Sequence, residues 1–187
     1  MAMSAAYTEW TVDMLDELPD DGDRYELIDG ALIVTPAPND VHQLIAGELY
    51  ARLLAYLRPG AIARPLVSPA DVRRADRRRN RLQPDVFVVR LRDGLRPVYP
   101  YDIGDLLLAV EVVSPSSIKT DYQRKRDLYV GAGIEYWVVD PEARTVAVWR
   151  SGIAPGSLFT DVLSWRPGGM PTGFTVDLRE FFMTALS

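Results

Sequence analysis

Two apolar runs that each carry an acidic residue constrain this chain more than any other feature of its sequence. Asp85 directly precedes the run at residues 86–89, and Glu111 lies inside the run at residues 106–113. Runs of this length and composition predict buried β-strands. A carboxylate in such a strand costs free energy unless a metal ion or a basic side chain compensates its charge. The two runs therefore predict a charged site within a sheet.

The predicted strands at residues 84–90 and 106–113 can pair as adjacent antiparallel strands, with residues 85–90 matching residues 106–111 in length. In that register Asp85 lies opposite Glu111, and Arg90 lies opposite Leu106. Directly opposite residues have Cβ atoms about 4.5–5.5 Å apart, so two carboxylates placed there repel each other unless a divalent cation lies between them. Hard oxygen ligands of this kind suit Mg²⁺ or Mn²⁺. We therefore expect Asp85 and Glu111 to be metal ligands.

Lysine is rare in this chain, because only two of the 21 basic residues are lysines, and both follow Glu111 closely. A helix is predicted from about residue 119 to 130, and Lys125 shares one stripe of it with Tyr122 and Tyr129. Lys125 therefore faces inward, whereas Lys119 falls off the stripe. An inward ammonium needs a carboxylate or a developing negative charge nearby. The alternative is that Lys125 snorkels or pairs with Asp121 at i−4.

The remaining elements alternate irregularly between strands and helices. Asp29-Gly30 predicts a tight I′ turn in a hairpin at residues 25–34, and Asn39 or Asp40 can cap a helix reaching about Leu57. Further strands are expected at residues 61–67, 84–90, 106–113, 135–140, 145–149, 158–165 and 174–176, with short helices at residues 11–18 and 178–186. Neither GxGxxG nor GxxxxGK[ST] occurs, which argues against a doubly wound nucleotide-binding sheet. The order predicts one α/β (α+β) domain spanning residues 1–187, with a core at about 24–150 and C-terminal strands and a helix at 151–187.

Composition excludes several classes of protein. No apolar stretch approaches ~18 residues, so no transmembrane helix is expected. The N-terminus has neither the basic nor the apolar segment of a signal peptide. The absence of cysteine excludes disulfides and thiolate metal sites, and the net charge of −5 argues against non-specific coating of nucleic acid. Together these features favour a cytoplasmic protein.

One segment departs from the acidic balance. Residues 73–81 carry six arginines and one aspartate. Such a run can contact nucleic acid, because arginine suits phosphate geometry. A solvated loop is the favoured alternative, since arginine replaces lysine throughout this chain.

Several stretches, taken in order, resemble the bacterial Uma-two family of restriction-endonuclease-like proteins. The matching positions are residues 24–30 (RYELIDG), 36–38 (PAP) with His42, 83–86 (QPDV), 110–116 (VEVVSPS), Asp121 with Lys125, and 135–141 (EYWVVDP). The resemblance implies the PD-(D/E)XK nuclease fold, a central mixed sheet flanked by helices, with an N-terminal hairpin. It implies that Asp85 is the aspartate of the PD element and Glu111 the second acid. In the parent motif a lysine stands two residues after that acid, where this chain has Val113. In the Uma-two pattern the lysine lies on the following helix, which fits Lys125.

The resemblance implies a Mg²⁺- or Mn²⁺-dependent endonuclease acting on DNA, as a homodimer. Asp85 and Glu111, with the carbonyl of Val112, would hold the metal, and Lys125 would orient or deprotonate the attacking water or stabilise charge on the phosphate. Two alternatives are a catalytically silent nuclease-fold module that binds nucleic acid or a protein, and a hydrolase of another phosphorylated substrate. The intact acids and lysine favour activity, because a degenerate site would be free to lose them.

Weaker candidates surround this triad. Glu26 is either a carboxylate behind the metal ligands or a partner of Arg24, and His42 lies either at the mouth of the site or in a capping or packing role. Glu48 and Asp121 are further possible contributors. Tyr99 and Tyr101 are expected at a substrate or interface contact, and Tyr136 and Trp137 in the core. The C-terminal aromatic residues either form a dimer interface or close the sheet; they are Trp149, Phe159, Trp165, Phe181 and Phe182.

Overall fold

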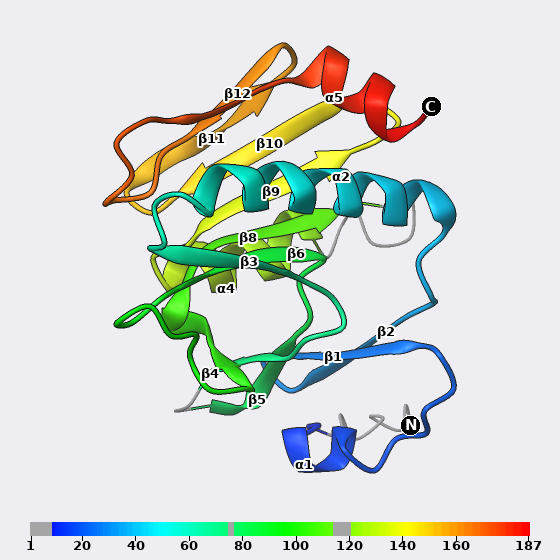
Figure 1. Cartoon of the computed structure of the whole chain (residues 1–187). Coiled ribbons are helices and arrows are strands. Elements are labelled where there is room, and N and C mark those ends of the chain that lie inside the picture. Colours follow the sequence, from blue (N-terminus) through cyan, green and yellow to red (C-terminus); the bar gives the residue numbers. More distant parts are fainter. Residues whose placement is uncertain (1–8, 75–76, 114–120) are drawn as a thin grey trace.

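The computed structural model describes residues 9–74, 77–113 and 121–187, with the backbone alone described at residues 77, 121, 122 and 154. Within these residues six strands form a central sheet: β3 (Ala63–Val67), β6 (Val86–Arg90), β8 (Leu106–Val112), β9 (Glu135–Asp140), β10 (Thr145–Arg150) and β11 (Ile153–Phe159). Their order is β11-β10-β9-β8-β6-β3, and the sheet is mixed because β8 and β9 run parallel. Figure 1 shows this sheet at the centre of the molecule.

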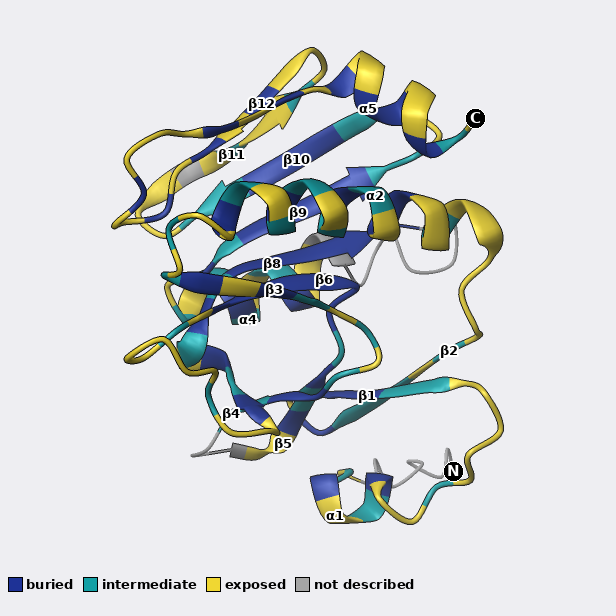
Figure 2. Ribbon diagram, in the orientation of Figure 1, coloured by how far each residue is buried: buried dark blue, intermediate teal, exposed yellow. Residues whose placement is uncertain are grey.

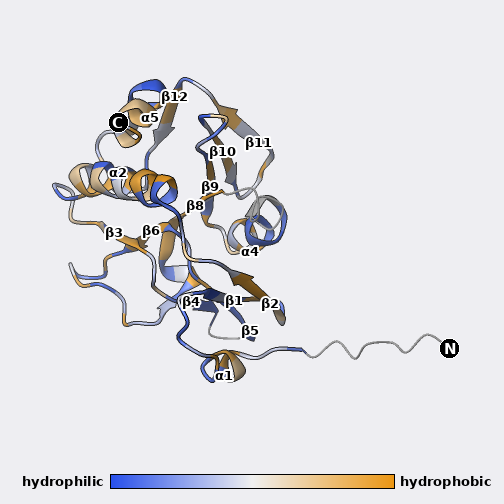
Figure 3. Cartoon of the chain, turned by 90° about the vertical axis from the view of Figure 1, so that its right-hand side faces the viewer, coloured by the Kyte–Doolittle hydropathy of each residue, from blue (hydrophilic) through white to orange (hydrophobic). Residues whose placement is uncertain are grey.

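Helices cover both faces of the central sheet. Helix α2 (Asp40–Leu57) lies on one face and α4 (Arg126–Gly131) on the other, as Figure 3 shows edge-on. Helix α5 (Leu178–Ala185) packs beside α2, next to a small hairpin of β12 (Val162–Trp165) and β13 (Phe174–Asp177). Strands that are covered on both faces need apolar side chains at every position, which explains the continuous runs in β6 and β8. The strands predicted in the central sheet at residues 61–67, 84–90, 106–113, 135–140 and 145–149 are confirmed, and so is the helix capped by Asn39, whose side chain accepts from the His42 N–H.

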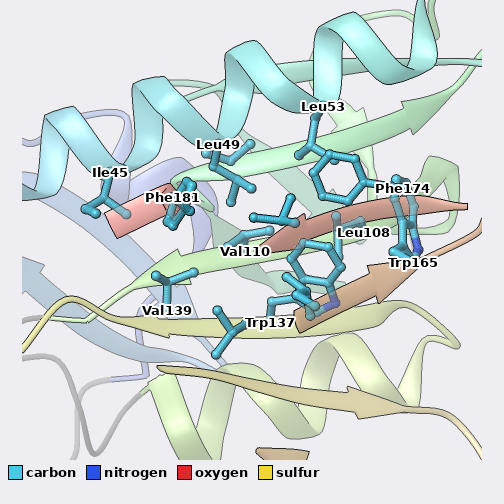
Figure 4. Packing of buried hydrophobic residues seen from close by; sticks show 14 of the residues in the cluster. Ile45, Leu49, Leu53, Leu108, Val110, Trp137, Val139, Trp165, Phe174 and Phe181 are labelled. Carbon is cyan, nitrogen blue, oxygen red and sulfur yellow. The ribbon is translucent and has the colours of Figure 1, made fainter. Parts of the chain in front are cut away.

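The larger apolar core lies between α2 and the central sheet. Ile45, Leu49 and Leu53 of α2 point onto Leu108 and Val110 of β8 (Figure 4). Figure 2 shows β6, β8 and β9 as the most continuously buried elements. The C-terminal aromatic residues Trp165, Phe181 and Phe182 belong to this core, as does Trp137, while Tyr136 is buried on the opposite face. The prediction that Tyr136 and Trp137 lie in the core is confirmed. Trp165, Phe181 and Phe182 are buried against the sheet, so for these three residues the prediction that they close the sheet is confirmed as well.

The register of β6 and β8 sets the position of the two acids. Val86 lies opposite Val110, which places Asp85 opposite Glu111 as predicted. At the other end Leu106 pairs with Val89, so the predicted pairing with Arg90 is wrong by one residue. The cause is a bulge in β8, where an extra residue interrupts the ladder. The bulge lies away from the acids and leaves their alignment unchanged.

A second sheet of five strands lies below the first in Figure 1. Its strands are β1 (Arg24–Ile28), β2 (Ala31–Thr35), β4 (Val72–Arg74), β5 (Arg77–Leu82) and β7 (Tyr101–Asp102), followed by a single 3₁₀ turn at Ile103–Asp105. The predicted hairpin is confirmed as β1 and β2. Asp29 and Gly30 have φ of 49° and 82°, as a I′ turn requires.

The arginine run is an element of this sheet, so the predicted solvated loop is wrong. Its described residues belong to β4 and β5, and several of its arginines bind acids of the N-terminal segment that contains α1 (Val12–Leu15). Arg81 contacts Asp16 at 2.7 Å and the buried Asp71 at 3.0 Å. Two further pairs, Arg78–Asp13 and Arg79–Glu9, measure 3.3 and 2.8 Å. The sequence pattern missed these strands because their apolar positions are few, and distant acids balance their charge.

Smaller differences lie at the two ends of the chain. Helix α1 is shorter than the predicted helix at residues 11–18, and Thr11 is its N-cap. The predicted strand at residues 158–165 is divided by a turn between β11 and β12. None of the described helices is both long and apolar enough to cross a membrane.

Candidate active site

The candidate site lies where the two sheets meet. Side chains alternate along β8, so Glu111 shares with Ala109 the face that looks toward α4, and Asp85 shares that face with Phe87 of β6. In the smaller sheet the alternation of β1 turns Glu26 toward the same seam, while Leu27 packs against α1. The acids therefore lie on one side of the central sheet.

Lys125 reaches this seam from an irregular helical segment. Residues Asp121–Lys125 form a π-helical turn before α4 begins. Such turns are rare and frequent at functional sites. The first part of the predicted helix, including Lys119, lies outside the described residues, as does the side chain of Asp121. Lys125 is 2% exposed, so it faces inward as the helical stripe predicted.

The ammonium of Lys125 joins two buried carboxylates. Its Nζ lies 2.8 Å from Oε2 of Glu26 and 3.0 Å from Oε2 of Glu111. Both acids are almost completely buried. Glu26 is held further by its Oε1, which accepts from the backbone N–H of Gln83 at 2.8 Å. The contacts with Lys125 and with the Gln83 N–H compensate the burial of the Glu26 carboxylate in β1.

Asp85 is held by three donors. Arg24 Nη1 lies 2.5 Å from Oδ1, and His42 Nε2 lies 2.8 Å from Oδ2. The backbone N–H of Val112 also donates to Oδ2, at 2.7 Å. Arg24 extends along the seam, with its Nε 3.9 Å from Glu26 Oε2. Arg24 and Lys125 thus link three carboxylates, Asp85, Glu26 and Glu111, into one cluster.

The cluster shifts the protonation of its members. Burial alone would raise the pKa of Asp85. The hydrogen bond from His42 and the positive charges of Arg24 and Lys125 outweigh burial and lower this pKa to about 2. Burial alone would lower the pKa of Arg24, but the surrounding carboxylates, Asp85 first, raise it above its ordinary value. Both groups are therefore charged at neutral pH.

A divalent cation fits the chemistry of this donor set. Within the described part of the chain, the carboxylates of Asp85, Glu26 and Glu111 contact the basic side chains of Arg24 and Lys125. Hard oxygen donors of this kind suit Mg²⁺ or Mn²⁺. Asp85 contacts Arg24 and His42, and Glu111 contacts Lys125; a cation held by both acids stays a prediction. Among the described residues, no three acidic or histidine side chains stand ready to hold a metal ion.

A cleft of about 590 Å³ opens beside the cluster. Asp85, Arg24 and His42 lie in its wall. The start of α2, the loop after β3 and the acidic turn before β1 complete it. A cavity of this size is typical of a small-molecule or nucleotide-sized site. His42 therefore lies at the mouth of the candidate site, next to one of the two proposed metal ligands.

Comparison with known proteins decides the family. The model of the Uma2 (Uma-two) family, described as "Putative restriction endonuclease", matches residues 12–178. The chain belongs to the Uma2 family. A crystal structure from Anabaena variabilis, described as "a putative nuclease belonging to DUF820", superposes with a TM-score of 0.77 at 21% identity, covering 94% of this chain and 99% of that one. The restriction-endonuclease-like fold is confirmed. None of the curated proteins matches the chain.

The Uma2 match does not by itself assign roles to residues, and the structure separates the sequence candidates. It brings together Asp85, Glu111, Lys125, Glu26 and His42. It does not bring Glu48 to them, because that carboxylate contacts Arg52 at 2.6 Å, and Arg52 contacts Glu180 of α5 at 3.1 Å. Tyr101 is buried beside Phe87, and Tyr99 is exposed.

Sequence reasoning missed the place of Arg24 and Gln83 in this Uma2 site. Arg24 contacts Asp85, and Gln83 binds Glu26 through its N–H. The signal was available for Arg24, because alternation along β1 places it on the same face as Glu26. No comparable signal exists for Gln83, since its contribution is made by the backbone.

The low pKa of Asp85 makes a prediction about acid stability. A carboxylate whose pKa falls on folding stabilises the folded protein at any pH above its pKa in the unfolded chain, here 3.8. This stabilisation is lost as the pH falls from 3.8 toward the folded pKa of about 2. We expect Asp85 to contribute about 2 kcal/mol that disappears over this interval. Urea unfolding between pH 5 and pH 2 should show a steeper loss in the wild type than in Asp85→Asn. Equal slopes would contradict the assignment.

Proposed function

We propose that this protein is a divalent-metal-dependent endonuclease that hydrolyses phosphodiester bonds of DNA. The observation that carries the proposal is the convergence of Asp85, Glu111 and Lys125 in one buried cluster beside a cleft. The family description, "Putative restriction endonuclease", and the description of the structural neighbour as a nuclease support it. Homodimer formation and a cytoplasmic location remain predictions.

Asp85 and Glu111 would hold the metal ion, Mg²⁺ or Mn²⁺. When bound, the ion would polarise a phosphate oxygen and lower the pKa of a bound water. The protein contributes fixed ligands, because Asp85 is oriented by His42 and by the Val112 N–H. Such outer contacts set the direction of a ligand's lone pairs.

Lys125 supplies the positive charge of the reaction. Glu26 and Glu111 fix its Nζ from two sides, so it is positioned before substrate arrives. In a buried site an oriented ammonium stabilises developing negative charge on the phosphate strongly, because little solvent screens it. It can also donate a hydrogen bond to the attacking water. This oriented charge is the main catalytic resource that the chain itself offers for phosphoryl transfer.

The cleft restricts how nucleic acid can approach. Among the described residues, its wall carries Asp20, Asp23 and Asp85, against Arg24 and His42. An acidic wall repels a polyanion, so the strand must be held by the proposed metal contact and by few basic groups. Arg78, Arg79 and Arg81 of the arginine run do not line the cleft and instead bind the N-terminal acids. We therefore expect weak binding of DNA without metal.

The direct test is cleavage by the purified protein. Supercoiled plasmid, single-stranded DNA and RNA are incubated with Mg²⁺, with Mn²⁺ or with chelator, using wild type, Asp85→Asn and the matched control Glu48→Gln. We expect metal-dependent cleavage of DNA by wild type and by Glu48→Gln, and none by Asp85→Asn. Cleavage of RNA but not of DNA would overturn the proposed substrate and support the proposed phosphodiester hydrolysis.

A catalytically silent nuclease-fold module is the second candidate. One observation favours it: both oxygens of Asp85 already bind side-chain donors, and no group of three ligands is preformed among the described residues. This candidate predicts no cleavage of any of the three substrates with either metal. That result would overturn the endonuclease proposal.

A further inference from the structure

Arg24 differs from Lys125 in its access to solvent. The Arg24 side chain is 18% exposed and lies in the wall of the cleft, whereas the Lys125 side chain is 2% exposed. Arg24 also holds the carboxylate that faces the cleft, through Asp85 Oδ1. Asp85 Oδ1 is thus held by a side chain that is partly open to the cleft.

We propose that Arg24 is an exchangeable counter-ion. It neutralises Asp85 in the metal-free protein, and it leaves Asp85 for the phosphate of the substrate when a divalent cation binds. The proposal rests on the proposed function, because it assumes that Asp85 is a metal ligand. On this proposal Arg24 lowers the affinity of the site for the metal ion and later contacts the substrate.

Electrostatics requires the exchange. A guanidinium and a divalent cation cannot both lie against Asp85 Oδ1, because they repel each other at a distance where little solvent screens the charges. The other oxygen, Oδ2, already accepts from His42 and from the Val112 N–H. Departure of Arg24 alone therefore frees Oδ1 as a hard oxygen ligand, whereas freeing Oδ2 would require the loss of two donors.

The released guanidinium can move into the cleft, where a phosphate of the substrate would lie. Arg24 Nη1 also donates to the carbonyl of Gln83 at 3.2 Å, a residue of the same wall. The planar fork of arginine matches the two oxygens of a phosphate. A phosphate that binds near Asp85 therefore meets the group that the metal displaced, and metal binding prepares the site for the substrate.

The first test measures metal binding without nucleic acid. Mn²⁺ is titrated into wild type, Arg24→Gln and the matched control Arg52→Gln by calorimetry. Arg52 is comparably exposed, at 23%, and also binds carboxylates, but on α2 and α5. We expect Arg24→Gln to bind Mn²⁺ at least about tenfold more tightly, since no charge-assisted hydrogen bond must first be broken. Arg52→Gln should match the wild type.

Two further measurements test the contact with the substrate and do not depend on Arg24→Gln, which could fail to fold. In cleavage assays Arg24→Lys, which keeps the charge but not the fork, should raise KM for DNA several-fold. In the wild type, ¹⁵N-labelled arginine side chains are followed by NMR while Mg²⁺ is added. We expect the resonance of Arg24, identified by its absence in Arg24→Lys, to shift as the ion binds.

The outcomes separate this inference from the function on which it rests. Mn²⁺ binding that depends on Asp85 but is equal in wild type and Arg24→Gln would overturn the counter-ion role alone. An Arg24 resonance that stays in place through Mg²⁺ saturation would do the same. Absence of Mn²⁺ binding in the wild type and in both arginine variants would overturn the metal-dependent function together with the inference.

Discussion

Replacing Lys125 with methionine is expected to lower the free energy of unfolding by about 3–5 kcal/mol. Methionine has a similar length but no charge, so Glu26 and Glu111 would face each other in a buried place without the ammonium that now joins them. Breaking a buried ion pair by removing one partner leaves an uncompensated charge, which costs more than the pair contributes. Urea unfolding, followed by tryptophan fluorescence, measures the change.

Two further variants test whether the loss of stability in Lys125→Met comes from the two buried acids. Arg126→Met removes a cation one residue away whose contact is to the exposed Asp127, and it should change stability by less than about 0.5 kcal/mol. Glu26→Gln combined with Lys125→Met should recover part of the loss, because it removes one of the two facing charges. If the double variant is no more stable than Lys125→Met, repulsion between the acids is not the cause.

The second large effect is expected from Glu111→Gln. This change should lower the rate of metal-dependent DNA cleavage roughly 10³-fold, the size of effect produced by loss of one preorganised electrostatic group. The fold should survive, because glutamine has nearly the shape of glutamate and Lys125 keeps its contact with Glu26. We expect a change in the free energy of unfolding of less than about 1 kcal/mol. Single-turnover nicking and thermal unfolding measure the two quantities.

Glu48→Gln is the matched control for Glu111→Gln. It removes one acid of the same kind from α2, where the carboxylate binds Arg52 at the surface. Cleavage should be unchanged. A Glu111→Gln protein that is folded and still cuts DNA at the wild-type rate would show that Glu111 is not a metal ligand.

The sequence predicted the elements that have strong local signals. The Asp29-Gly30 turn, the Asn39 cap and the apolar runs around Asp85 and Glu111 each have a local physical cause, and each lies where expected. The register at the acids followed from segments of matching length and from strand pairing. These features depend on neighbours in sequence or on one pair of strands.

The features that were missed depend on distant partners. The strands of the arginine run are stabilised by acids about 65 residues away, as in Arg81 with Asp16. The bulge in β8 is a feature of its pairing with β6, a strand about 20 residues earlier in the chain. The contact of Arg24 with Asp85 spans 61 residues and joins two sheets whose relative placement no local pattern encodes.

The position of the charged cluster between the two sheets changes how its persistence should be interpreted. Arg24 and Glu26 come from one sheet, Asp85 and Glu111 come from the other, and their contacts join the two. A protein without activity would therefore still need the ammonium of Lys125, because its loss leaves Glu26 and Glu111 facing each other in a buried place. A descendant that gave up cleavage could lose Glu111 at little cost in stability but not Lys125, so the lysine would outlast the chemistry that it serves.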